Sequence, residues 1–142
     1  MKKTIDVKRK QYFKLNEAIF DRPIHVFLNY SHNEFVKWVR KYGVDGYKND
    51  NEYDVNFYAF STIFHGKNRP DEWVICMQSF NWTIKDQGSL IHEIVHTILK
   101  IWNNNNIPHT LDNQEFLAHS VGQLYEDIAA KIFRLNKINK KS

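Results

Sequence analysis

The sequence predicts an α+β fold, in which a small, mainly antiparallel sheet packs on helices and two long helices form the C-terminal part. Two observations carry this prediction. Before residue 80, segments rich in β-branched and aromatic residues alternate with turn residues, as strands do. After residue 80, the apolar residues recur about every three and a half positions, which is typical of helices. The order of strand, helix, two or three strands and two helices is that of an α+β domain.

The length and composition predict a single domain over residues 1–142. A chain of 142 residues suffices for one hydrophobic core and is short for two. Hydrophobic residues make up 42% of it and aromatic residues 15%, which excludes a disordered or low-complexity protein. The apolar runs are far shorter than a membrane span requires. We therefore expect a soluble protein with no membrane partner.

Charge and cysteine usage bear on the partners and the compartment. The net charge of +4 arises from the basic ends, 1–20 and 136–142, which we expect to be less ordered. The middle of the chain is near neutral, and this disfavours nucleic acid as a partner. The one cysteine, Cys76, excludes a disulfide or a thiolate zinc cluster within the chain. Because no apolar segment follows the basic start, we expect a cytoplasmic protein.

The first third of the chain predicts a strand followed by a helix. Residues 24–30 are rich in β-branched and aromatic side chains, which indicates a strand. Ser31 and Glu34 have the spacing of a capping box, and Gly43 is a typical helix end. The polar residues 44–53 then predict a loop.

A hairpin is predicted in the middle of the chain. Residues 55–65 and 73–80 both have strand-like composition, and the residues between them, 66–71, are typical of a turn. The second of these strands leads directly into the first long helix. We expect residues 73–80 to be the sheet edge that is nearest to a site on that helix.

Two long helices are predicted at the end. Thr83 and Asp86 again have the spacing of a capping box, and a wide apolar arc follows at helical spacing. The asparagine run at 103–106 ends this helix. A second amphipathic helix is predicted from Asp112 or Asn113 to about Arg134.

The first long helix carries a pattern that points to a metal site. His92 and His96 are four residues apart, so both imidazoles lie on one helix face and can bind one ion. Glu93 is rotated toward the place of a metal-activated water. Chance would produce this His-Glu-x-x-His pattern roughly 0.02 times in such a chain. The alternative is two surface histidines on a helix whose Glu93 pairs with Lys100 or Lys85 in solvent.

The second helix offers a third ligand. Glu115 lies near its start, and the 18 residues after His96 allow the chain to reverse and return past the metal. Ala118, Gly122 and Ala129 share its face, and small residues allow two helices to approach closely.

This arrangement resembles the gluzincin metallopeptidases, in which a His-Glu-x-x-His helix is followed by a helix that donates a glutamate. The resemblance covers roughly residues 83–130. It implies a zincin-like fold, Zn²⁺ as the cofactor, and His92, His96 and Glu115 as its ligands. It also implies that Glu93 is the general base.

Glu115 and the residues that follow it resemble the small members of that group rather than the large ones. The Glu-x-x-Ala form of Glu115 and Ala118 is similar to small single-domain members, including those of phages and mobile elements, so the resemblance implies a phage or prophage protein. In the thermolysin-like enzymes a Ser-Asp pair stands where this chain has Ala118 and His119, and that Asp orients the first ligand histidine. Here Asp127, Glu126 or a backbone carbonyl could take this role.

Three further histidines are candidates for the surroundings of the metal. His119 follows Glu115 by one turn and could replace it as a ligand, contact the site as a second partner or stabilise the transition state. His109 lies in the loop between the helices, and His65 lies at a strand end; either could stabilise the transition state. Ordinary polar side chains are the alternative for all three.

Together these features predict a zinc-dependent metallopeptidase whose substrate is a peptide or protein. Glu93 would take a proton from the metal-activated water and pass it to the leaving amine. Two other functions stay open. The chain could be a non-catalytic, zincin-fold binding or structural protein of a phage or mobile element, or a nucleic-acid-associated accessory protein. The pattern leaves the oligomeric state open.

Overall fold

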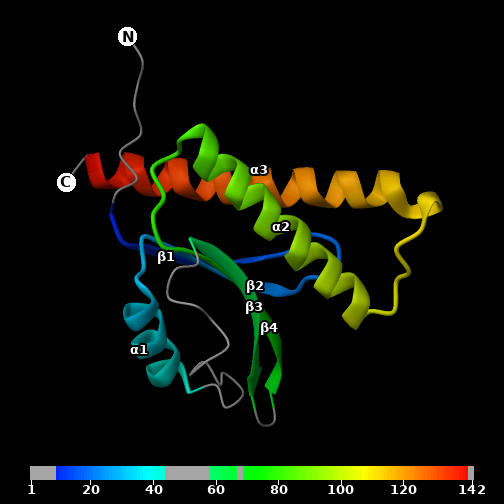
Figure 1. The fold of residues 1–142 in the computed structure, drawn as a ribbon, viewed down its shortest axis with the longest axis horizontal. Helices are drawn as coiled ribbons and strands as arrows, with labels where there is room; N and C mark the ends of the chain where they lie inside the picture. Colours follow the sequence, from blue (N-terminus) through cyan, green and yellow to red (C-terminus); the bar gives the residue numbers. More distant parts are fainter. Residues whose placement is uncertain (1–8, 44–57, 67–68, 141–142) are drawn as a thin grey trace.

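The computed structural model describes residues 9–43, 58–66 and 69–140 and has an α+β architecture (Figure 1). One sheet lies between helix α1 on one face and helices α2 and α3 on the other (Figure 1). The described elements, in chain order, are β1 (Gln11–Asn16), β2 (Pro23–Leu28), α1 (His32–Tyr42), β3 (Ala59–Gly66), β4 (Arg69–Met77), α2 (Ile84–Asn104), the 3₁₀ turn η1 (Leu111–Asn113) and α3 (Gln114–Lys140).

The sheet is mixed, and two of its three strand pairings are antiparallel. Its four strands lie in the order β1-β2-β4-β3. The outer pairs, β1 with β2 and β3 with β4, are antiparallel, whereas the central pair, β2 with β4, is parallel. The chain between β2 and β4 includes α1 and β3, and this crossover lets β4 return in the direction of β2.

This strand order corrects the expectation that residues 73–80 form a sheet edge. Strand β4 pairs with β2 on one side and with β3 on the other, so it is an interior strand. The strand at the edge beside α2 is β3. The predicted hairpin is present, with β3 and β4 antiparallel and a bulge between Phe64 and Gly66.

Strand β1 lies within the N-terminal segment that the sequence analysis expects to be less ordered. It pairs antiparallel with β2, with Phe13 opposite Val26. Phe13 is buried while Lys14 is exposed, which is the alternation of a strand with one face on the core. At the other end of the chain, α3 continues to Lys140 through most of the second expected segment. The predicted loop at 44–53 and the first residues of the strand predicted at 55–65 lie outside the described residues.

The local signals for helix ends are confirmed. Ser31 and Thr83 are N-caps with complete capping boxes, in which Glu34 and Asp86 return the hydrogen bond to the backbone of the cap. Gly43 ends α1 with φ of 78°, a left-handed conformation that glycine adopts without strain. No helix in the described parts of the chain combines the length and the apolar character that crossing a bilayer requires.

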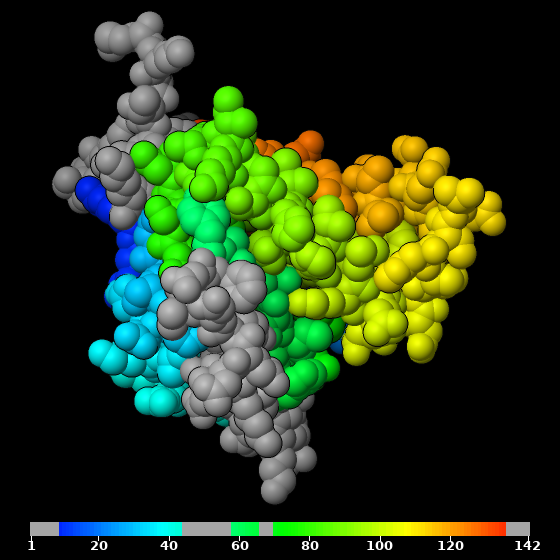
Figure 2. All heavy atoms as spheres, in the orientation of Figure 1, coloured from blue at the N-terminus to red at the C-terminus, as the bar shows by residue number. Residues whose placement is uncertain are grey.

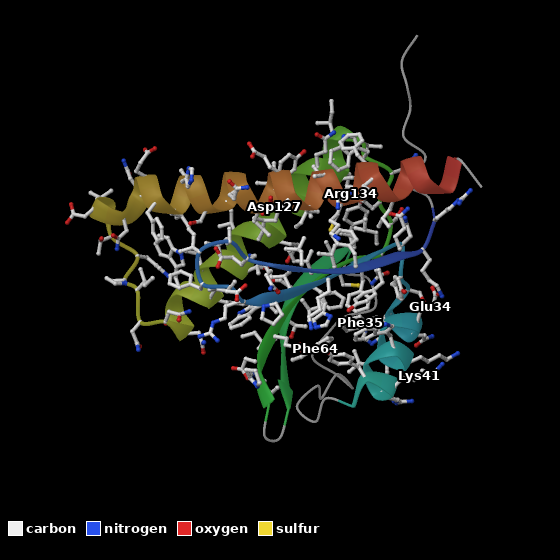
Figure 3. All side chains as sticks on the ribbon, turned by 180° about the vertical axis from the view of Figure 1, so that it is seen from behind. Glu34, Phe35, Lys41, Phe64, Asp127 and Arg134 are labelled. Carbon is white, nitrogen blue, oxygen red and sulfur yellow. The ribbon has the colours of Figure 1, made fainter. Side chains whose placement is uncertain are left out.

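Two hydrophobic clusters occupy the two faces of the sheet. The larger joins the sheet to α2 and α3 and includes the fully buried Leu90, Ile94 and Ile128. The smaller joins the sheet to α1, where Phe35 stacks on Phe64 with ring centroids 6.1 Å apart (Figure 3). Each helix layer is therefore fixed to the sheet by its own apolar contacts.

A polar network lies within the smaller cluster. His25 is fully buried, and its Nδ1 atom lies 2.7 Å from the Tyr12 hydroxyl. Its Nε2 atom lies 3.3 Å from Glu72 Oε2. Glu72 also accepts hydrogen bonds from the Tyr42 hydroxyl, at 2.9 and 3.0 Å, and from Lys14, at 3.3 Å. Sequence analysis gave this histidine no role, yet the network ties β1, β2, β4 and the end of α1 together.

We expect replacement of Glu72 by Gln to lower the free energy of unfolding by about 1–3 kcal/mol at pH 7. Burial raises the pKa of Glu72, but the hydrogen bond from Tyr42 and the interactions with His25 and Lys14 outweigh it, so the pKa lies below its ordinary 4.5. A lowered pKa adds stability above pH 4.5 that is lost as the pH falls through the folded-state value. The difference between wild type and variant should therefore shrink below pH 4.5. Urea unfolding between pH 3 and pH 7 measures it.

Glu126→Gln, on the exposed face of α3, is the matched control and should leave stability within about 0.5 kcal/mol of wild type. If the difference in the free energy of unfolding between wild type and Glu72→Gln stays constant from pH 7 to pH 3, the assigned network is contradicted.

Candidate metal centre

The rotation of α2 decides which side of its His-Glu-x-x-His pattern reaches solvent. Leu90, Ile94 and Ile98 of its apolar arc are buried against the sheet and α3. Residues 92 and 96 lie on the opposite side, so both histidines are exposed. In the space-filling view α2 forms part of the face that is turned to the viewer (Figure 2).

The two histidines contact each other through the atoms that a metal would use. Their Nε2 atoms are 3.1 Å apart, and their ring centroids are 4.7 Å apart. This separation suits a hydrogen bond from one ring to the other. It also suits a shared ion, because two nitrogens bound tetrahedrally to one zinc ion lie about 3.3 Å apart. Of the predicted ligands, the structure thus brings His92 and His96 together.

Glu93 lies on another side of the helix, toward β3. Its side chain is 7% exposed, and its backbone carbonyl accepts a hydrogen bond from the Thr97 hydroxyl at 2.8 Å. Glu93 and His92 both line one open pocket of about 440 Å³. Its other lining residues are Tyr58, Ala59, Lys85, Gly88 and Ser89. The pocket therefore joins one candidate ligand, the candidate base and the first residue of the edge strand.

Lys100 lies two turns beyond Glu93 on the same side of α2. Its amine donates hydrogen bonds to the carbonyl oxygen and to the hydroxyl of Ser61 in β3, both at 3.0 Å. Burial lowers the pKa of Lys100, and the charge of Glu93 opposes that shift. The sequence suggests this lysine, with Lys85, only as a solvated partner of Glu93 and not as a partner of Ser61. The available signal is its spacing of seven residues from Glu93, which places both on one helix face.

The structure does not bring Glu115 to the histidine pair. Glu115 is exposed in the first turn of α3, and the next residue, Phe116, stacks on Trp102 with ring centroids 5.1 Å apart. Trp102 is six residues beyond His96, about 9 Å along the helix axis. Within residues 9–43, 58–66 and 69–140, no three His, Cys, Asp or Glu side chains form a group that could hold a metal ion.

The other histidine candidates lie in three separate places. His119 is exposed on α3. His109 is exposed and its ring is 6.1 Å from that of Trp102, near the end of α2. His65 contacts Asp71 at 2.8 Å across the β3–β4 hairpin. No described contact links any of them to the histidine pair.

The residues considered for orienting His92 lie on α3. Asp127 accepts a hydrogen bond from Gln123 on the same helix at 3.0 Å, and Glu126 is exposed (Figure 3). Their part in the site remains a prediction. Comparisons of the chain with protein-family models, with curated proteins and with solved structures find no match.

The geometry of His92 and His96 predicts a metal site in which both imidazoles bind the same ion. Replacing either His92 or His96 by Ala should weaken Zn²⁺ binding at least tenfold, because one imidazole alone cannot chelate. Competition against a chromogenic zinc indicator measures the affinity. His32→Ala, on α1, should bind zinc as wild type does. Equal affinity in the wild type and in both variants of the pair would exclude this site.

Proposed function

We propose that the protein is a zinc-dependent peptidase with a zincin-like site on α2. The observation that carries this proposal is the pocket in which the exposed His92, the buried Glu93 and the edge strand meet. A metal ligand, a carboxylate and a main-chain docking edge in one place are the parts that metal-assisted hydrolysis of a peptide bond requires.

In this proposal His92 and His96 hold the zinc ion, and Glu115 is the third ligand. The spacing of the histidine nitrogens supports the first two assignments. Glu115 is supported by the gluzincin resemblance alone, because the side chain is exposed and remote from the pair in the structure. When bound, zinc supplies a water of lowered pKa and a positive charge that polarises a carbonyl group.

Glu93 performs the proton transfers. Glu93 lines the same pocket as His92, which supports its role as the acceptor beside the proposed water. It would take the proton from this water as the water attacks and would deliver it to the departing amine.

The substrate is a peptide in extended conformation. In the described part of the chain, β3 is an edge strand next to α2 with no strand paired on its outer side, and an extended peptide can add to such an edge through main-chain hydrogen bonds. Edge strand β3 replaces residues 73–80 as the proposed docking strand, because β4 is paired on both sides. The single cysteine, which is buried, is consistent with a reducing cytoplasm as the site of action.

One observation favours the alternative of a non-catalytic protein with this fold. Among the described residues, no third donor accompanies the two histidines. A site of two imidazoles binds metal weakly and lacks the ligand set of catalytic zinc sites. A structural or binding role at the same surface would need neither Glu93 nor Glu115.

Replacement of Glu115 by Gln tests the ligand set. We expect zinc affinity to fall at least tenfold, because a neutral amide is a poor zinc ligand. The matched control is Asp112→Asn, which replaces another exposed carboxylate, in η1 just before the same helix. If Glu115→Gln binds zinc as tightly as wild type, Glu115 is not a ligand and the non-catalytic alternative gains support.

Replacement of Glu93 by Gln tests the reaction. The zinc-loaded variant should cleave a peptide library at least a hundredfold more slowly than wild type, because general base catalysis is lost. It should still bind one zinc ion. Mass spectrometry of the library before and after incubation measures cleavage, and a chelator should abolish wild-type activity until zinc is restored.

Asp112→Asn, which replaces an exposed carboxylate of η1, should retain wild-type activity in the same assay. Equal cleavage by wild type and Glu93→Gln would remove Glu93 as the base. If neither protein cleaves any peptide, the peptidase proposal fails and the binding role remains.

A further inference from the structure

The hydrogen bonds of β3 show which of its backbone N–H and C=O groups point away from β4, at the outer edge of the sheet. The amide of Gln78 donates to the carbonyl of Tyr58 at 2.9 Å, so the polar groups of residue 58 point toward β4. In an antiparallel strand the backbone groups of alternate residues point to opposite sides. Those of Ala59, Ser61 and Ile63 therefore point away from β4, toward the side where an added strand would pair.

Lys100 occupies one position of this edge. Its amine is 3.0 Å from the outward carbonyl oxygen of Ser61 and 3.0 Å from the hydroxyl of the same residue. The lysine is half-buried, and this burial lowers the pKa of its amine. A lysine at a sheet edge opposes the pairing of another strand, because it takes the acceptor that the incoming amide needs.

The blocked position lies close to the proposed reaction site. Ala59 lines the pocket with Glu93 and His92, and Ser61 is two residues further along β3. Lys100 is seven residues beyond Glu93, about 10.5 Å along the helix axis. Among the described residues, no strand pairs with the outer edge of β3 at Ala59, whereas Lys100 occupies that edge one pairing position later, at Ser61.

We infer that Lys100 sets the length of peptide that the β3 edge accepts: a bound peptide pairs with Ala59 and must turn away before Ser61. The inference rests on the proposed peptidase function and names its substrate class. Preferred substrates are chain ends, short peptides or turns, in which the extended segment stops within about one residue pair of the site. In a long extended peptide, the residues beyond this point on the Ser61 side add nothing to the binding affinity.

A series of peptides that are extended stepwise on either side of a cleaved bond tests this inference. Zinc-loaded full-length protein is used, with affinity measured by fluorescence anisotropy and cleavage by kcat/KM. In wild type, affinity should stop rising after the first added residue on one side. In Lys100→Met, which keeps the aliphatic stem, each of the next two residues on that side should raise affinity about threefold.

Lys100→Arg keeps the donors and should show the wild-type limit, and Lys37→Met, on the exposed face of α1, serves as the matched lysine control. Thermal melts establish that each variant is folded. The same length profile in wild type and Lys100→Met, or a lack of binding by every peptide in both, overturns the inference. A length effect without cleavage overturns only the peptidase function, whereas cleavage without a length effect overturns only the role of Lys100.

Discussion

The burial of one face of α2 is the constraint on which the proposed site depends. Leu90, Ile94 and Ile98 are packed between the sheet and α3, and this fixes the rotation of the helix about its axis. The same rotation leaves His92 and His96 in solvent and directs Glu93 toward β3. A helix with the same pattern but a different buried face would separate the carboxylate from the sheet edge. The geometry of the proposed site is thus a consequence of apolar packing.

The two faces of the sheet contribute to different parts of the structure. The face toward α2 presents the edge strand to the proposed site, and Lys100 connects that helix to the strand. The face toward α1 holds the buried network around His25 and Glu72, whose contacts join three strands to the end of α1. Because β4 pairs with strands on both sides, it carries this network while β3 remains at the edge. Stability and the proposed chemistry therefore rely on separate sets of polar residues.

Sequence predicted the features that are encoded locally. The capping boxes at Ser31 and Thr83 lie within four residues, and both are present as expected. The strand Gln11–Asn16 was missed because its short alternating pattern gains meaning only when it pairs with β2. The parallel pairing of β2 with β4 has no local signal either. At the site, the i to i+4 spacing predicted the histidine contact, whereas spacing alone did not fix the rotation of α3 that leaves Glu115 exposed, or the contact of Lys100.

The location of zinc in crystals of the metal-loaded protein bears most directly on this interpretation. Anomalous diffraction at the zinc absorption edge identifies the ion without reference to activity. The proposal predicts one zinc ion per chain, about 2.0–2.1 Å from the Nε2 atoms of both His92 and His96, with Glu93 nearby and not coordinating. Zinc bound elsewhere, or no zinc at the pair in protein loaded with excess metal, would contradict it.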